Sequence, residues 1–231
     1  MRHLLAGGGG FVGSHLTELL LARGDDVVVV ASGLGGGTFA APTSLPGAAP
    51  QAEDVTVADL SGDGLPDVIA ATSSLDGPKF WLNTGAGFAA PVPLSSGTLL
   101  ATVAVAVGDL DDDGDPDVVA GLNYGTLVWY ERLPDGTFTE WPLSAFTADP
   151  LTTRLADLDG DEDLDVVVAW DGVEGLMWIE NLGGGAFGAG TLVNDTVAFP
   201  SGLAVADLDG DGDNDLVTTE PASGTVLALD N

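Results

Sequence analysis

Short apolar segments alternate with polar turns along most of the chain. From residue 33 onward, one apolar segment enters an acidic loop, a second leaves it, a third carries aromatic side chains, and a glycine turn leads to a fourth. This order recurs about every 50 residues. Four short strands per repeat, separated by turns, are typical of a β-propeller blade. The pattern therefore predicts an all-β propeller of four-stranded blades over residues 33–231.

A phenylalanine at the same place in each repeat indicates about four blades. These residues are Phe39, Phe88, Phe138 and Phe187, at steps of 49, 50 and 49. Residues 27–39 align without gaps to residues 126–138, so the chain is expected to begin with the third and fourth strands of a blade. It would then contain three complete blades and end after a third strand at residues 225–231. The terminal pieces could form a split blade that closes a small ring, or the chain could be an open part of a larger propeller.

Residues 1–32 have a different pattern. Arg2–Ala6 is predicted as a short strand, Gly7–Gly13 as a glycine turn, Ser14–Arg23 as an amphipathic helix, and Val27–Val30 as a second strand. This order predicts a truncated Rossmann-like β-α-β start ahead of the propeller repeats.

Four acidic loops of nine residues lie between the first and second strands of the repeats. They occupy residues 59–67, 109–117, 157–165 and 207–215, with starts 50, 48 and 50 residues apart. Aspartate recurs at positions 1, 3, 5 and 9, where Ser61 is the only replacement. Ca²⁺ takes roughly six to eight oxygen ligands, and a glycine at position 6 lets a loop wrap tightly around the ion. The loops are therefore predicted to bind up to four calcium ions, with a backbone carbonyl from position 7.

These loops are not EF-hands. An EF-hand needs a bidentate glutamate at position 12, which here is Ala70, Ala120, Val168 or Thr218. The flanking segments also predict strands, whereas an EF-hand loop lies between helices. One further departure concerns position 6 of the third loop, where Glu162 replaces glycine and introduces a Cβ into a turn expected to have a positive φ.

The charge of the chain fits a cation-binding protein. It has 36 Asp and Glu residues against 5 Lys and Arg, a formal net charge of −31. Such a charge disfavours nucleic acids and anionic membranes as partners. Because 45% of the residues are hydrophobic, the chain can still bury a core. No apolar run is long enough to span a membrane, and Glu18 interrupts the only candidate for a secretory signal.

The motif D-x-D-x-D-G-x-x-D, flanked by A-D-L and by D-[LV]-[VI], resembles the FG-GAP/VCBS repeats of integrin α-subunit heads and of many bacterial surface proteins. The resemblance covers about residues 33–231. It implies a calcium-binding β-propeller that acts in adhesion outside the cell or on its surface. The implied ligands are Asp59, Ser61, Asp63, Leu65 and Asp67; Asp109, Asp111, Asp113, Asp115 and Asp117; Asp157, Asp159, Asp161, Asp163 and Asp165; and Asp207, Asp209, Asp211, Asp213 and Asp215.

The N-terminal segment resembles the start of an NAD-dependent epimerase/dehydratase. The matching residues of GGxGFxGSHL are Gly7, Gly8, Gly10, Phe11, Gly13, Ser14, His15 and Leu16. In that family the glycines admit a pyrophosphate to the N-terminus of a helix. Here Ala31 stands where an acidic residue would hold the ribose, and the catalytic Tyr-x-x-x-Lys is absent. We therefore regard Gly7, Gly10 and Gly13 as vestigial candidates and do not expect NAD to bind.

The favoured function is a non-catalytic module that binds a protein or a glycan. An epimerase-like enzyme fragment, a propeller hydrolase and a structural spacer are the alternatives. The only histidines, His3 and His15, form no nucleophile–base pattern, and no catalytic residue is assigned. Tryptophans could stack on sugars, although at blade spacing we expect them mainly to fill the core. They are Trp81, Trp129, Trp141, Trp170 and Trp178.

Overall fold

The structure is a computed structural model. It describes residues 3–5, 18–21, 27–30, 43–47, 49, 51–73, 75, 77–95, 100–145, 148–172, 175–194, 197 and 199–231. Every helix or strand assigned within these residues is a β-strand. No helix in this described part of the chain could cross a membrane.

The strands form five antiparallel sheets in which chain neighbours pair. The first contains β1 (His3–Leu5), β2 (Glu18–Leu21), β3 (Val27–Val30) and β4 (Thr43–Ser44). The second contains β5 (Ala52–Ala58), β6 (Asp67–Thr72), β7 (Lys79–Trp81) and β8 (Val92–Pro93). The third contains β9 (Thr102–Gly108), β10 (Asp117–Leu122), β11 (Thr126–Arg132) and β12 (Phe138–Ala145). The fourth contains β13 (Pro150–Ala156), β14 (Asp165–Trp170), β15 (Leu176–Ile179) and β16 (Thr191–Leu192). The fifth contains β17 (Gly202–Ala206), β18 (Asp215–Glu220) and β19 (Thr225–Leu229).

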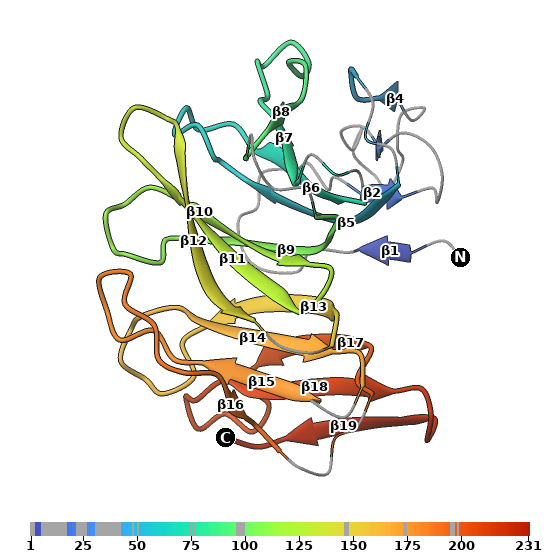
Figure 1. The fold of residues 1–231 in the computed structure, drawn as a ribbon, viewed down its shortest axis with the longest axis vertical. Coiled ribbons are helices and arrows are strands. Elements are labelled where there is room, and N and C mark those ends of the chain that lie inside the picture. The colour runs from blue at the N-terminus through green and yellow to red at the C-terminus, as the bar shows by residue number, and fades with distance from the viewer. Residues whose placement is uncertain are drawn as a thin grey trace.

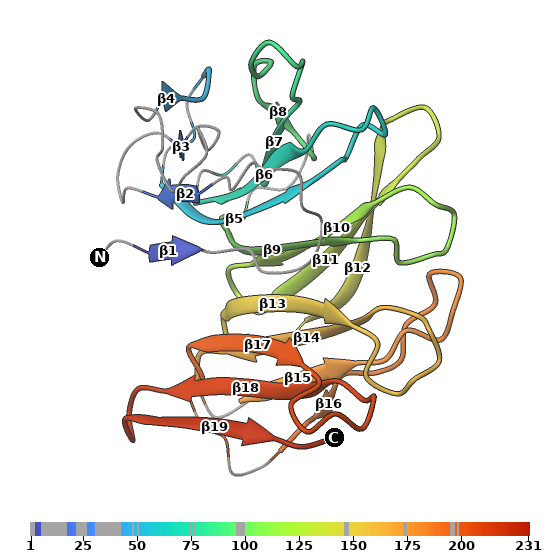
Figure 2. The ribbon, with the colours of Figure 1, turned by 180° about the vertical axis from the view of Figure 1, so that it is seen from behind.

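Successive sheets pack face to face. The first strands β5, β9, β13 and β17 lie beside one another in chain order, and β2 lies beside β5. Figures 1 and 2 show the second to fifth sheets following one another from the top to the bottom of the molecule. This radial succession of four-stranded units is the architecture of a β-propeller, as the sequence predicted.

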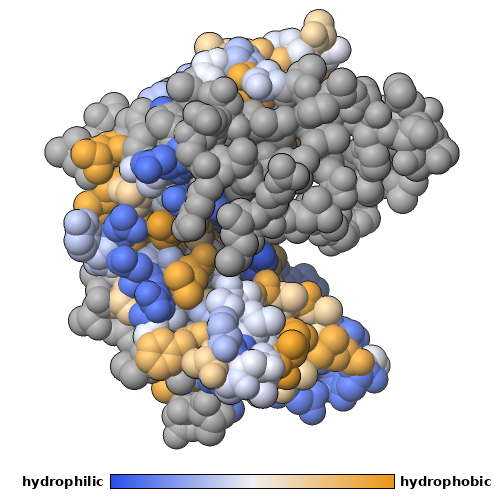
Figure 3. All heavy atoms as spheres, turned by 90° about the vertical axis from the view of Figure 1, so that its right-hand side faces the viewer, coloured by the Kyte–Doolittle hydropathy of each residue, from blue (hydrophilic) through white to orange (hydrophobic). Residues whose placement is uncertain are grey.

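The core lies between the sheets. All six residues of β6, β10 and β14 are buried, because both faces of these middle strands are covered by neighbouring sheets. The exposure of the leucine at position 2 of each acidic loop also shows whether a neighbouring sheet covers that loop. Leu60 and Leu110 are each 2% exposed, whereas Leu208 of the last loop is 53% exposed. On the side shown in Figure 3, hydrophobic and hydrophilic side chains are interspersed over the described residues.

The N-terminal segment differs from its prediction. Within the helix expected at Ser14–Arg23, Glu18–Leu21 is instead strand β2, paired antiparallel with β1 and β3. The leucine run suits both a helix and a buried strand, and the pairing partners decide between them. The rest of that expected helix, and the glycine turn at 7–13, lie outside the described residues.

The blade count changes with this correction. Strands β1 and β2 complete the first sheet, so the described residues form five sheets where about four blades were expected. The first and last sheets are separate, so the described strands of the two ends do not combine into one split blade. The domain boundary at residue 32 stays a prediction.

The tryptophans mostly follow the expectation that they fill the core. Trp81, Trp129 and Trp170 are buried and Trp178 is partly buried. Trp141 is 47% exposed and donates a hydrogen bond of 2.6 Å from Nε1 to a carboxylate oxygen of Glu131.

Candidate metal sites

Each acidic loop joins the first and second strands of a sheet through two positions of positive φ. At position 4 these residues are Gly62, Asp112, Gly160 and Gly210, with φ of 74°, 61°, 80° and 84°. At position 6 they are Gly64, Gly114, Glu162 and Gly212, with φ of 85°, 90°, 77° and 106°. The loops thus share one backbone conformation, and Glu162 adopts the left-handed region that its position predicted.

The carboxylate at position 1 organises the turn. Oδ1 of Asp59 accepts the backbone N–H of Gly62 at 2.8 Å, and Oδ2 accepts that of Gly64 at 2.7 Å. Asp157 makes the matching bonds to Gly160 and Glu162, at 2.8 and 3.0 Å. A carboxylate oxygen has two lone pairs, so these bonds fix its orientation and leave capacity for a cation.

The aspartate at position 9 is buried and ties the loop to its own sheet. Oδ2 of Asp67 accepts the N–H of Leu60 at 3.0 Å, and Oδ1 accepts that of Asn83 at 2.7 Å. The equivalent pairs of bonds recur at Asp117, Asp165 and Asp215. These four side chains are at most 1% exposed, so the backbone donors offset the cost of burying a carboxylate.

Positions 1, 3 and 9 converge in three of the loops. Their ligand atoms lie within 4.8 Å of one another in the triads Asp109–Asp111–Asp117, Asp157–Asp159–Asp165 and Asp207–Asp209–Asp215. In the first loop Ser61 occupies position 3 in place of a third carboxylate. Position 5 does not join these triads; its Oδ1 accepts the N–H of position 7, as Asp63 does from Leu65 at 2.9 Å.

Two buried oxygens support a cation at these loops. Oδ1 of Asp109 and Oγ of Ser61 are buried without a hydrogen-bond partner among the described residues. Buried polar atoms normally have a partner, and both atoms belong to predicted ligand positions. The donor set is made only of oxygens, which suits a hard cation such as Ca²⁺. The residues therefore fit the ion that the repeat implies: positions 1, 3 and 9 lie close enough to share a cation in three loops, and positions 5 and 7 stay predicted ligands.

Mutual proximity and burial raise the pKa of several of these carboxyl groups. Burial raises the pKa of Asp117 to about 7, although the N–H groups of Arg132 and Leu110 act in the opposite direction. Burial also raises the pKa of Asp165, and burial together with the charge of Asp113 raises that of Asp111. A cation would relieve both effects, because it stabilises the ionised form of every carboxylate around it.

An asparagine at the end of the third strand links consecutive loops, and the sequence reasoning missed it. Nδ2 of Asn181 donates to the carbonyl of Leu110 in the preceding loop at 2.9 Å, and to that of Leu164 in its own loop at 3.2 Å. Asn231 repeats this arrangement with Leu158 and Asn214. The signal was available in the sequence, since Asn83, Asn181 and Asn231 each lie 16 residues after the position-9 aspartate.

The third sheet has an arginine in place of this asparagine. The backbone N–H of Arg132 binds Asp117, and its Nη1 lies 2.6 Å from Oδ1 of Asp115, at position 7 of the same loop. In the third sheet an ion pair between Arg132 and Asp115 of the same loop therefore stands where other sheets have the asparagine amide.

The repeats identify the family of the chain. An FG-GAP-like repeat matches four overlapping segments, at residues 13–70, 59–120, 109–168 and 157–218. The chain therefore belongs to the FG-GAP-like repeat family. The first match crosses the boundary predicted at residue 32. The NAD-dependent epimerase resemblance of the N-terminal segment stays a prediction. No curated protein sequence matches the chain.

Solved structures share the fold at low sequence identity. An Agrocybe aegerita lectin, described as recognising non-reducing terminal N-acetylglucosamine, aligns with a TM-score of 0.61 and 20% identity over 94% of this chain. A Desulfotomaculum acetoxidans protein of unknown function aligns with a TM-score of 0.55 and 13% identity over 95% of this chain and 68% of its own. The Photorhabdus luminescens Tc holotoxin pore aligns with a TM-score of 0.50 and 20% identity over 93% of this chain. The chain spans 60% of the lectin chain and 10% of the toxin chain.

Proposed function

We propose that this protein is a non-catalytic, calcium-stabilised β-propeller that binds a protein or a glycan outside the cell or on its surface. The observation that carries the proposal is the repetition of one acidic loop four times, with the same backbone turn and the same buried anchor. The lectin with the same fold supports a binding function, since that protein recognises non-reducing terminal N-acetylglucosamine. Calcium would hold the loops rigid, and the loops would position the binding surface.

Calcium would act on the folded state. Carboxylates at positions 1, 3 and 9 repel one another without a cation, and the repulsion is relieved when the ion binds. A ligand that binds only the native state adds about 2.7 kcal/mol per site at a hundredfold excess over Kd. Up to four such sites would make calcium a large part of the stability of the fold.

Chelation tests this proposal. Thermal unfolding of the full chain is compared in excess calcium, in excess magnesium and in EDTA. We expect the highest melting temperature in calcium and a large fall in EDTA. Magnesium should stabilise the protein less than calcium, because it demands a smaller, more regular site. Asp157→Asn together with Asp207→Asn should reduce the calcium effect. An unchanged melting temperature in EDTA would exclude the calcium assignment.

A further inference from the structure

The acidic loops lie at one end of the sheets, and a second surface lies at the opposite end. That opposite end contains the turns from the second to the third strand of each sheet and the connections from one sheet to the next. We call it the turn end. In Figure 1 the acidic loops are on the left and the turn end is on the right, and Figure 3 looks onto the turn end.

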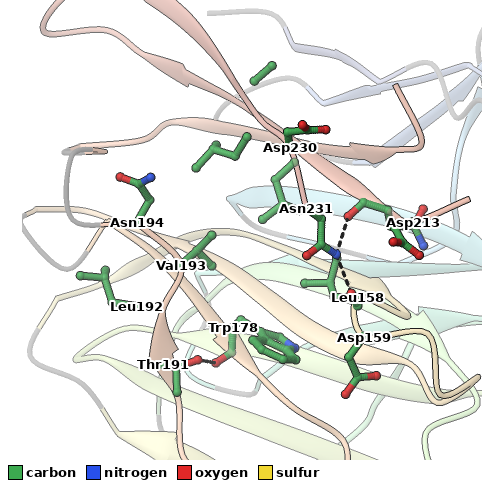
Figure 4. A pocket seen from close by; sticks show the side chains of 14 residues that line it. Leu158, Asp159, Trp178, Thr191, Leu192, Val193, Asn194, Asp213, Asp230 and Asn231 are labelled. Carbon is green, nitrogen blue, oxygen red and sulfur yellow. Dashed lines mark hydrogen bonds between the residues drawn. The ribbon is translucent and has the colours of Figure 1, made fainter. Parts of the chain in front are cut away.

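Two exposed aromatic side chains mark the turn end. Tyr124, in the turn between β10 and β11, is 79% exposed, more than any other large hydrophobic side chain in the described part of the chain. Phe199, in the connection that leads to β17, is 46% exposed. The hollow drawn in Figure 4 is lined by Asp159 and Asp213 of two acidic loops and includes neither aromatic residue, so it is a separate feature.

Both aromatic residues have a backbone conformation that disfavours them. The φ angle is 65° at Tyr124 and 54° at Phe199, in the left-handed region where a Cβ is crowded. Burial of the rings does not compensate for this conformation, because both side chains are exposed. Conformations of this kind concentrate at functional sites, which agrees with a role for the two rings outside the core.

Backbone hydrogen bonds join the two aromatic residues through a pair of aspartates. The N–H of Tyr124 donates to Oδ1 of Asp149 at 2.5 Å, and the N–H of Asp171 donates to the carbonyl of Asp149 at 2.8 Å. The N–H of Phe199 donates to the carbonyl of Gly172 at 3.1 Å. Both aspartates are exposed. One surface therefore crosses the third, fourth and fifth sheets, with its carboxylates between its rings.

This surface is negatively charged. Neither Asp149 nor Asp171 forms an ion pair with a described residue. Arg132 is paired within an acidic loop, and Nη1 of Arg154 donates to Oγ1 of Thr152 on its own strand. Aromatic rings attract cations through their faces, and carboxylates attract them through charge. A guanidinium group suits both, because it stacks on a ring and forms paired hydrogen bonds with a carboxylate.

We propose that the turn end of the third to fifth sheets binds an arginine-rich segment of another protein. Tyr124 and Phe199 stack on guanidinium groups, and Asp149 and Asp171 pair with them. The formal net charge of −31 steers such a segment toward the protein, whereas a neutral glycan gains nothing from that charge. This surface is distinct from the one that the calcium loops would position, so the two proposals can fail independently.

An acetylated, amidated peptide of sequence GRGRGRGRG tests the proposal. In an extended segment alternate residues point to the same side, so its arginines can all face the protein. The peptide is titrated by calorimetry into the full chain in saturating calcium, which occupies the acidic loops. We expect saturable binding of one peptide per chain that weakens as KCl is raised. The lysine version should bind less tightly, since an ammonium cannot stack or pair in the same way, and the glutamine version should not bind.

Variants of the protein locate the site. Tyr124→Asn and Phe199→Asn remove the rings and keep the backbone N–H groups. Asparagine tolerates a positive φ, so both variants should melt at or above the temperature of the parent. Each should weaken peptide binding about two- to fivefold, and the double variant about tenfold. Asp171→Asn should also weaken it, because the variant removes one of the paired charges.

Two matched controls test whether the effect is local. Trp141→Ala removes an exposed ring from β12, and Asp135→Asn removes an exposed charge from the turn between β11 and β12. Both controls should bind the peptide as the parent does. Melting in calcium and in EDTA verifies that every variant is folded and responds to calcium.

Three outcomes would overturn the inference. The first is unchanged binding by the Tyr124 and Phe199 double variant, and the second is an equal loss in the two controls, which would indicate attraction to the net charge alone. The third is absence of peptide binding while the calcium response is intact, which leaves the proposed calcium role standing. Binding of N-acetylglucosamine that is insensitive to KCl and lost in Tyr124→Asn, without peptide binding, would instead assign the surface to a glycan.

Discussion

At the scale of single residues, the positions of the acidic loops that set the backbone turn differ from the positions that are predicted to bind the metal. Positions 4 and 6 have positive φ in all four loops, and six of these eight residues are glycine. Nothing lies within 4 Å of a Cβ built at Gly64, Gly114 or Gly212. A side chain at position 6 therefore meets no steric obstacle, and its cost comes from the backbone conformation alone.

Glu162→Gly should relieve this cost in the third loop. We expect the free energy of unfolding in calcium to rise by up to about 1 kcal/mol, and calcium affinity to increase up to about fivefold. Urea unfolding and calorimetric titration measure the two effects. Glu162→Gln keeps the Cβ and removes the charge, so it should give no gain. Gly212→Ala should have the opposite effect in the last loop, and weaker calcium binding by Glu162→Gly would contradict the strain argument.

Asp54 on β5 should make stability depend on pH. Its Oδ2 accepts the N–H of Val105 on β9 at 3.2 Å and its Oδ1 that of Val55 at 2.9 Å, while burial raises its pKa. A raised pKa means that the folded state holds this proton more tightly, so stability is lost as pH rises from the unfolded pKa through the folded one. Arg154, the charged group acting on it, lowers the pKa in part.

Asp54→Asn removes this titration and keeps a hydrogen-bond acceptor. We expect the melting temperature of the variant, relative to the parent, to increase between pH 4 and pH 8. The loop carboxylates titrate in both proteins, so their effect cancels in the difference. A difference that stays constant or decreases with pH would show that Asp54 is stabilised in its ionised form.

At the scale of elements, the sequence predicted the strands of the repeats after residue 33 but did not predict the first sheet, β1 to β4. The spacing of the phenylalanines and of the acidic loops located the strands around them, because both features sit at turns with strict backbone needs. Glu18–Leu21 was predicted as helix since a short leucine run satisfies either period, and only pairing with β1 and β3 makes it a strand. The amide of Asn181 bonds to a carbonyl 71 residues away; its recurrence 16 residues after the position-9 aspartate marks the residue in the sequence but does not name this distant partner.

Removing such a link should destabilise the joint between two sheets. Asn181 is 1% exposed, and Asn181→Ala leaves the carbonyls of Leu110 and Leu164 without this donor. We expect a loss of about 1–3 kcal/mol in the free energy of unfolding, measured by urea denaturation. Asn83→Ala is the matched control, because among the described residues Nδ2 of Asn83 donates to Pro66 of its own, more exposed loop and to no other sheet. Equal losses in the two variants would show that the link between sheets adds nothing.

At the scale of the whole molecule, electrostatic repulsion acts among the acidic loops and the other acidic residues of the chain. The formal net charge is −31, with 5 Lys and Arg residues in the chain. The four loops hold between three and six Asp or Glu residues each, and four calcium ions would cancel about eight of these charges. Self-repulsion of this kind destabilises the compact state and is screened by salt.

Salt should therefore stabilise the protein most strongly when calcium is absent. We expect the melting temperature in EDTA to rise between roughly 20 mM and 500 mM KCl, because the Debye length shrinks from roughly 20 Å to about 4 Å and repulsion between separate loops is screened. In saturating calcium the same change in salt should raise it less, since the closest repulsions are already neutralised. Potassium chloride suits the comparison because monovalent ions are poor substitutes at sites built for a divalent cation. An equal salt effect in both conditions would mean that the loop carboxylates are not the main source of repulsion. The acidic residues outside the loops would then be that source.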